Sequence, residues 1–185
     1  MGAAMTTITA ILDFWLDEVG PEKWFVKDEA LDRAVGDRFG AAYERAAAGL
    51  CDGWRKSPAG CLALLILLDQ FPRNMFRGSC RAYATDAKAR SLAKWALARN
   101  IDDQVDTIAR QFFLLPLQHS EGFADQTLCV DLTADRLSAS DSYDYAVQHR
   151  DIVQRFGRFP HRNAILGRRT TDEEAAFLAG PDSSF

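Results

Sequence analysis

Two stretches of the chain place arginine and asparagine side chains in the same order behind a phenylalanine-proline pair. The first Arg-Asn segment, Gln70–Arg77, reads Gln-Phe-Pro-Arg-Asn-Met-Phe-Arg, and the second, Arg158–Arg168, reads Arg-Phe-Pro-His-Arg-Asn-Ala-Ile-Leu-Gly-Arg. A guanidinium offers a planar fork of donors to a carboxylate or phosphate, and an asparagine amide both donates and accepts. We therefore predict a site for a small anionic ligand. We also expect the proline of each segment to end a helix and to leave the polar side chains on irregular backbone.

The predicted site takes its donors from both Arg-Asn segments and its acidic and titratable groups from nearby. The predicted ligand-binding residues are Asp69, Arg73, Asn74, Arg77, His119, Glu121, His149, Arg158, His161, Arg162, Asn163 and Arg168. Asp69 follows eight apolar residues near an expected helix end, where a buried carboxylate needs a cation or several donors. His149 is expected to point inward from its helix. A structural ion pair for Asp69, and core histidines with satisfied hydrogen bonds, remain open as alternatives.

The same residues are compatible with three kinds of function. The leading hypothesis is binding of a carboxylate or phosphate in a cleft lined by arginine, asparagine and histidine. The first alternative is a helical-repeat module that binds a peptide or an acidic segment. The second is a hydrolase-like enzyme whose candidate acid-base groups are His119, Glu121, His161 and Asp69. The sequence does not decide whether the protein is an enzyme, and a purely structural role for both segments is a further possibility.

Several functions lack their usual sequence signature. The chain contains no glycine-rich dinucleotide or nucleotide loop and no nucleophile elbow. The four cysteines form no C-x-x-C pair, and His119-x-Glu121 lacks metal-ligand spacing, so we expect neither a cofactor nor a metal. A formal charge of −4 disfavours nucleic-acid binding, although Arg150–Arg169 holds six arginines and one aspartate.

The chain is expected to act in the cytoplasm. Its beginning lacks a basic region, and Asp13 soon interrupts the apolar residues, so no signal peptide is indicated. The longest apolar run, Cys61–Leu68, is far shorter than the ~20 residues of a membrane span. We interpret the cysteines as reduced thiols. The oligomeric state is not indicated.

The elements that must position the site are helices, because the apolar residues recur with a helical period and no stretch alternates as a strand would. We predict one all-α domain over residues 1–185, a compact array of about seven or eight antiparallel helices. The expected helices are Thr7–Val19, Asp28–Gly49, Ser57–Leu68, Thr85–Asn100, Asp102–Pro116, Ser120–Leu137, Ser142–Phe156 and one that begins at Thr171. Asp28, Ser57, Thr85, Ser120 and Thr171 are the expected N-caps.

Three long motifs resemble one known family. They are Leu68-Asp-Gln-Phe-Pro-Arg-Asn74 with Arg77, His119-Ser-Glu121, and Arg155-Phe-Gly-Arg-Phe-Pro-His-Arg-Asn163 with Gly167-Arg168. They are similar to the bacterial family called domain of unknown function 924, and the resemblance extends from Asp13-Phe-Trp15 to the helix at Thr171–Phe177. It implies an all-helical fold like a tetratricopeptide stack. It implies no activity and no catalytic residues, because the family has none assigned.

Overall fold

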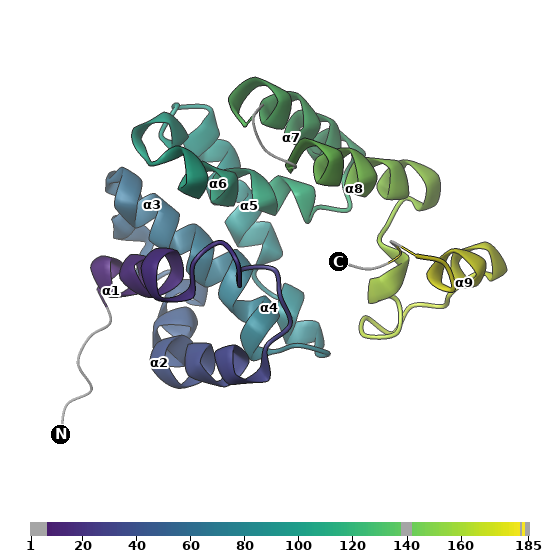
Figure 1. The fold of residues 1–185 in the computed structure, drawn as a ribbon, viewed down its shortest axis with the longest axis horizontal. Coiled ribbons are helices and arrows are strands. Elements are labelled where there is room, and N and C mark those ends of the chain that lie inside the picture. The colour runs from purple at the N-terminus through teal and green to yellow at the C-terminus, as the bar shows by residue number, and fades with distance from the viewer. Residues whose placement is uncertain (1–6, 138–141, 182, 184–185) are drawn as a thin grey trace. The chain divides into compact units, whose positions relative to one another are not determined.

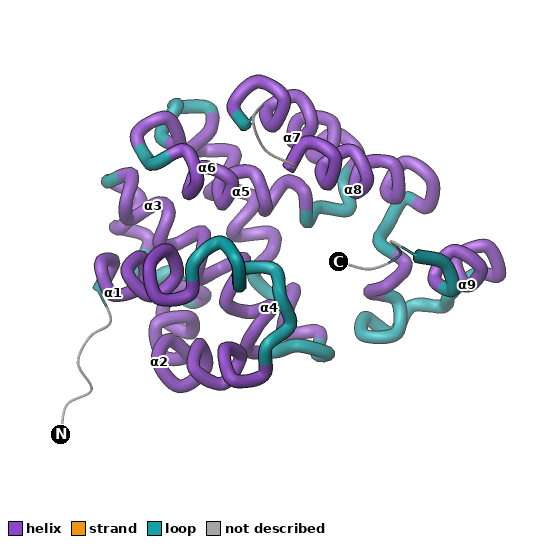
Figure 2. The backbone as a smooth tube through the Cα atoms, in the orientation of Figure 1, coloured by secondary structure: helices purple, strands orange, loops and turns teal. Residues whose placement is uncertain are grey.

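The computed structural model describes residues 7–137, 142–181 and 183, and every regular element within them is helical (Figure 2). The α-helices are α1 (Ile8–Leu12), α2 (Glu29–Ala47), α3 (Pro58–Leu65), α4 (Phe71–Met75), α5 (Asp86–Leu97), α6 (Thr107–Gln118), α7 (Phe123–Arg136), α8 (Ser142–Phe156) and α9 (Asp172–Leu178), as labelled in Figure 1. Asp13–Val19 and Ile66–Gln70 are π-helical. The predicted all-α class is confirmed.

The described residues group into two compact units. The first unit holds the chain up to Arg77 together with Arg81–Pro116, and the second holds Gly78–Cys80 and the chain from Leu117 onward. Helices α1–α5 therefore belong to the first unit and α7–α9 to the second, while α6 contributes only its last two residues to the second. One domain over residues 1–185 and tetratricopeptide-like stacking both stay predictions.

Helix starts were the best-predicted local features. The Asp28 carboxylate accepts hydrogen bonds from the N–H groups of the first turn of α2, and the Ser57 hydroxyl accepts one from the first turn of α3. Thr171 and Glu174 form the expected capping box at α9. These side chains satisfy N–H groups that a helix leaves without partners, and they need no distant residue to do so.

The core of the first unit surrounds the apolar helix that the sequence indicated. Every side chain from Cys61 to Leu68 is buried, and so is the predicted inner face of α2. Phe71 continues this core by packing edge-on against Trp15, with the ring centroids 5.4 Å apart. A helix that is apolar on all sides is stable only where other elements pack around it. Here α1 and α5 contact α3, and α2 contacts its π-helical continuation.

The first proline does not end its helix, contrary to the prediction. Helical backbone runs from Pro58 through the π-helical turn and on to Met75, so Arg73 and Asn74 lie in α4 rather than on irregular backbone. Pro72 cannot donate to the carbonyl of Leu68, but the Thr85 hydroxyl donates to that oxygen at 2.6 Å. The missing backbone hydrogen bond is thus replaced from another helix. For the same reason Thr85 occupies the N-cap position of α5 without capping it through its side chain.

Three other boundaries differ from the prediction. Pro116 lies inside α6, which continues to Gln118 because the flanking leucines are buried and packing holds the turn together. That helix begins at Thr107 after a separate turn, not at Asp102. Ser120 does not cap α7. Its hydroxyl instead donates to the Asp125 carboxylate at 2.7 Å, and α7 begins three residues later.

In the second unit α7 and α8 lie side by side (Figure 1). Ile152 and Val153 of α8 pack with Phe159 in a small apolar core, and Phe156 and Phe177 are partly buried against it. The Phe156 and Phe177 rings, 5.0 Å apart, attach α9 to the end of α8. Phe159 of the second Arg-Asn segment is itself part of this small core.

No helix within the described ranges is both long and apolar enough to cross a bilayer. None of the four cysteines forms a disulfide, and only Cys80 is exposed.

Candidate functional site

The two Arg-Asn segments belong to different units. Asp69, Arg73, Asn74 and Arg77 lie in the first unit, and the predicted site residues from His119 onward lie in the second. The expected common cavity of the two segments stays a prediction. Each set is therefore described within its own unit.

In the first unit Arg73 binds two carboxylates. Its guanidinium donates two hydrogen bonds to Asp86, at 3.0 and 3.2 Å, and lies 3.7 Å from the buried carboxylate of Asp69. Burial lowers the pKa of Arg73, but the charges of Asp69 and Asp86 outweigh that effect and raise it overall. Gln70 also donates to Asp69, at 2.5 Å. These contacts match the structural ion pair that was the alternative for Asp69.

The other two residues of this segment share one acidic partner, Asp32 of α2. Asn74 donates to its carboxylate at 2.8 Å, and Arg77 donates twice, at 2.7 and 2.9 Å. Burial raises the pKa of Asp32, yet the hydrogen bonds from Arg77 and Asn74 bring it below its ordinary value. In the first unit, then, the donors of the Arg-Asn pattern join α4 to neighbouring helices, and a ligand-binding role for them stays a prediction.

The second Arg-Asn segment lies on irregular backbone, as predicted, but its proline does not end the preceding helix, because that helix ends four residues before Pro160. Helix α8 ends at Phe156, and Gly157 follows with a φ of 69°, a left-handed conformation that glycine adopts without strain. Phe159 is fully buried, and Pro160–Arg162 form a single 3-10 turn. The buried ring fixes the segment to the core, so the polar residues on either side of it have defined positions.

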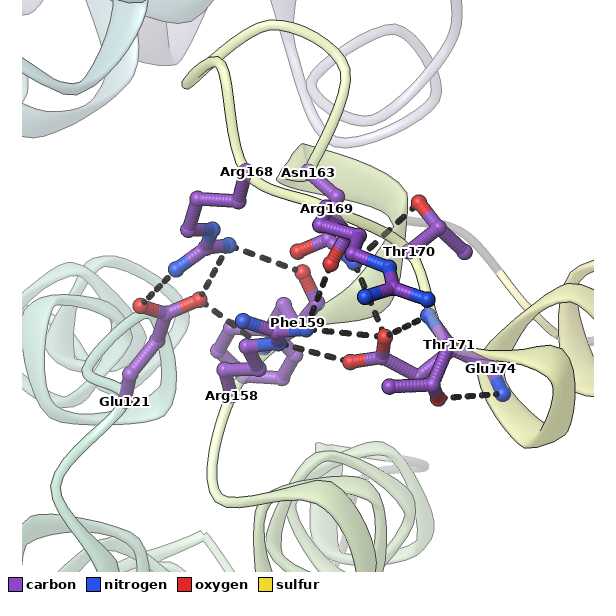
Figure 3. A network of polar contacts seen from close by, with 9 residues as sticks. All are labelled: Glu121, Arg158, Phe159, Asn163, Arg168, Arg169, Thr170, Thr171 and Glu174. Carbon is purple, nitrogen blue, oxygen red and sulfur yellow. Dashed lines mark hydrogen bonds and ion pairs between the residues drawn. The ribbon is translucent and has the colours of Figure 1, made fainter.

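Glu121 joins the chain before α7 to the second segment (Figure 3). Its carboxylate accepts two hydrogen bonds from Arg168, at 2.8 and 3.0 Å, and one from the backbone N–H of Phe159 at 2.8 Å. Burial raises the pKa of Glu121, but Arg168 and the Phe159 N–H hold it below its usual range. Glu121 is therefore an ionised acceptor at neutral pH, and a poor general acid.

Glu174 has the same function on the other side of Phe159 (Figure 3). It accepts hydrogen bonds from Arg158 at 2.6 and 2.8 Å, from the Thr171 N–H at 2.8 Å and from Asn163 at 3.3 Å. The bond from Arg158, followed by that from Thr171, lowers the pKa of Glu174 to about 2. Arg158 and Asn163, both predicted to bind ligand, thus hold α9 in place.

The remaining polar residues form a histidine–arginine cluster, which we define as His119, His149, His161 and Arg162 around the ring of Phe159. The Arg162 guanidinium lies over that ring, 4.5 Å from its centroid, and donates to the carbonyl of His119 at 3.0 Å. The rings of His149 and His161 each lie 5.6 Å from the Phe159 ring. All three histidines of the chain therefore meet at one place in the second unit.

His149 forms the buried side of the cluster. Its Nδ1 is 2.7 Å from the carbonyl oxygen of Tyr145, one turn earlier in α8. Because a carbonyl only accepts, Nδ1 carries the proton, and Nε2 of the neutral ring is an acceptor. Burial, followed by the charges of His119, Arg162 and His161, lowers the pKa of His149 to about 3. The ring is neutral at physiological pH.

His119 and His161 form the accessible side, since both side chains are partly exposed. Burial and then Arg162 lower the pKa of His161 to about 4, while Glu121 opposes the shift. The charge of His119 contributes to the lowered pKa of both other histidines. The cluster consequently combines the positive charge of Arg162 with the neutral imidazoles of His149 and His161. Within the described residues no group of His, Cys, Asp or Glu side chains has the arrangement of a metal site.

A family model described as bacterial protein of unknown function, domain of unknown function 924, matches residues 11–182. The chain belongs to this family. As a member of domain of unknown function 924, it is similar to a solved protein of unknown function from Agrobacterium tumefaciens, with 47% identity and a TM-score of 0.88 over 92% of this chain and 96% of that one. A search of curated proteins finds no match. Membership of this family indicates neither a reaction nor a ligand, so only the residues of the site bear on the function.

In this member of the family, the sequence alone did not identify the residues that hold the polar side chains of the site in position. Phe159 was visible only as part of a repeated Phe-Pro pair, and Glu174 only as a helix-capping residue. Nothing in the spacing links Asp32 or Asp86 to the first segment, because these pairs join different helices. The available signals were the position of His161 within the second segment and the inward orientation predicted for His149.

Proposed function

We propose that this protein binds a small anionic ligand, a carboxylate or a phosphate group, at the histidine–arginine cluster of its second unit. One observation carries the proposal: His149, His161 and Arg162 surround a single buried aromatic ring, Arg162 donates to the backbone carbonyl of His119, and His119 and His161 remain partly exposed. The anion would contact the imidazole N–H groups and the guanidinium, with Phe159 as the apolar floor.

The electrostatics of the cluster support an anion in particular. Burial is the main cause of the lowered pKa of His149 and of His161, and the positive charge of Arg162 lowers both further, so the potential there disfavours a further cation. The same potential attracts an anion. A guanidinium in a partly desolvated position forms charge-assisted hydrogen bonds with carboxylate or phosphate oxygens.

The cluster is a better candidate than the arginines that flank it. Arg158 and Arg168 each use two donors on a carboxylate of the chain, Glu174 and Glu121. Arg162 donates to a neutral backbone carbonyl and lies over an aromatic face.

The low pKa of His161 favours ligand binding over acid-base catalysis. A general acid-base group works best when its pKa lies near the working pH, whereas the pKa of His161 is about 4. Hydrolase-like chemistry and peptide binding by a helical-repeat surface stay alternative hypotheses. A cytoplasmic location is likewise part of the proposal, and the four cysteines, which form no disulfide, support it.

Thermal stability measured with acetate and with phosphate, at ionic strength matched with sodium chloride, tests the proposal. At ten times the dissociation constant a ligand stabilises the folded state by about 1.4 kcal/mol, which raises Tm by about 3–6 °C for a chain of this size. Arg162→Gln should abolish the shift, and His161→Asn should weaken it. Arg155→Gln is the matched control, because Arg155 precedes the same segment but pairs with Glu173 on the exposed surface. An unchanged shift in both cluster variants would refute the proposal.

A further inference from the structure

In the first unit, two guanidiniums lie over the ring of Trp95, which is partly exposed. The guanidinium carbon of Arg55 is 5.2 Å from the ring centroid, and that of Arg99 is 4.7 Å from it. At such distances an indole face attracts a cation. Arg55 comes from the 3-10 turn Asp52–Lys56 before α3, whereas the ring and Arg99 come from the end of α5 and the residues after it. We call Arg55, Lys56, Trp95 and Arg99 the tryptophan patch.

The cations of the tryptophan patch have no acidic partner within the described residues. There the guanidinium of Arg55 and the ammonium group of Lys56 form no hydrogen bond and no ion pair, and both side chains are exposed. Arg99 donates to the uncharged carbonyl of Trp95 at 3.1 Å, and a guanidinium has further N–H groups to offer. The patch therefore presents three positive charges, none of which forms an ion pair with a described carboxylate.

Arginines over other aromatic rings of the chain are paired with carboxylates. These arginine, ring and carboxylate groups are Arg38 with Phe14 and Glu18, Arg73 with Tyr83 and Asp86, Arg81 with Phe76 and Glu44, and Arg155 with Phe156 and Glu173. In each of them the chain itself supplies the negative charge. At Trp95 the ring holds two guanidiniums, and a partner that brought carboxylates would supply what the chain supplies at the other rings.

We propose that the tryptophan patch is a docking site for an acidic segment of another protein, one that presents two carboxylates a few residues apart. The patch lies in the first unit, so this inference is independent of the histidine–arginine cluster. Each guanidinium can hold one carboxylate through two parallel N–H···O bonds, and Lys56 adds a third cation. Because the ring of Trp95 already holds both guanidiniums, less side-chain freedom is lost on binding.

The surroundings of the patch favour a short acidic peptide segment over a nucleic acid. Asp52 begins the same 3-10 turn as Arg55, and Asp102 and Asp103 follow α5. A polyanion carries charge along its whole length and would meet these carboxylates, whereas two carboxylates need only the patch itself. Proteins that bind single strands also stack bases on open aromatic faces, but guanidiniums already lie over the Trp95 ring. The net charge of −4 adds to the repulsion of a polyanion.

The test titrates the ¹⁵N-labelled full chain with a short peptide of alternating glutamate and serine, and in parallel with its glutamine–serine counterpart, at low ionic strength. The indole N–H resonance of Trp95, assigned by its loss in Trp95→Phe, reports binding at the patch. The glutamate peptide is expected to shift this resonance to saturation, and the glutamine peptide to leave it unchanged. Arg55→Gln and Arg99→Gln should each weaken binding about twofold to fivefold, the range of an exposed ion pair.

Arg33→Gln is the matched control. It removes the same charge from an exposed position of α2, where Arg33 contacts only Glu29 of its own helix, so it should leave the peptide affinity nearly unchanged. A loss as large as that in Arg55→Gln would show that net charge alone attracts the peptide, and would overturn the docking site. No shift with the glutamate peptide, or an equal shift with the glutamine peptide, would overturn it as well. Tighter binding of a short oligothymidylate to the same residues would refute the acidic-segment partner.

Discussion

Acid should destabilise the fold through His149, and the size of the effect follows from its environment. The pKa of this ring is about 3 in the folded chain, against an ordinary value of 6.5. Between these values the unfolded chain binds a proton that the folded chain does not, so the free energy of unfolding falls as the pH falls. On lowering the pH from about 7.5 to about 5, this one group should cost about 2 kcal/mol of stability.

The matched variant is His149→Asn. An asparagine amide can still donate to the Tyr145 carbonyl, which now accepts from Nδ1 of the ring, but it does not titrate. Urea unfolding of both proteins, followed by circular dichroism at about pH 7.5 and pH 5, gives the two losses. The variant should lose about 2 kcal/mol less than the wild type. Any cost of removing the ring is the same at both pH values and cancels. Equal losses would show that His149 is not held neutral, and the description of the cluster would be wrong.

Three further predictions concern the stability of individual helices, each measured by urea unfolding. Gly60→Ala should lower the free energy of unfolding by about 1–3 kcal/mol, because the added Cβ would clash with the backbone carbonyl of Trp54. Gly40→Ala is the matched control: its added methyl group meets nothing, so it should stabilise α2 by about 0.5–1 kcal/mol. Thr85→Val should cost about 1–3 kcal/mol, because a buried carbonyl next to the proline loses its donor, whereas Thr85→Ser should be far milder. Thr171→Ala should cost about 1 kcal/mol by removing the cap of α9, and a cost no larger than that of an exposed substitution would contradict the capping box.

Local chemistry explains which parts of the fold could be predicted from the sequence. The caps at Asp28, Ser57 and Thr171 involve groups within three residues of one another, so spacing alone indicates them. Pro72 and Pro116 were interpreted as helix ends, and both lie within helical backbone. Proline normally removes a helix hydrogen bond, and at Pro72 a hydroxyl from a distant part of the chain supplies the replacement. No pattern in a single sequence indicates that a hydroxyl from a distant residue will donate to this carbonyl.

In the candidate site, too, local features could be predicted from the sequence and contacts between distant residues could not. The convergence of its polar residues stays a prediction, whereas the inward orientation expected of His149 is confirmed. The partners of Arg73, Arg77 and Arg158 could not be read from the sequence, because each ion pair joins elements that meet only after folding. The resemblance to domain of unknown function 924 was confirmed, but the family description gives no activity and no ligand.

The location of a bound anion tests the account most directly. A crystal of the full chain soaked in bromide, a monoanion whose anomalous scattering identifies it without ambiguity, should show a peak within hydrogen-bond distance of Arg162 and of His119 or His161. The same peak should disappear in Arg162→Gln and persist in Arg155→Gln. Bromide peaks at other arginines, with none at the cluster around Phe159, would contradict the proposed site.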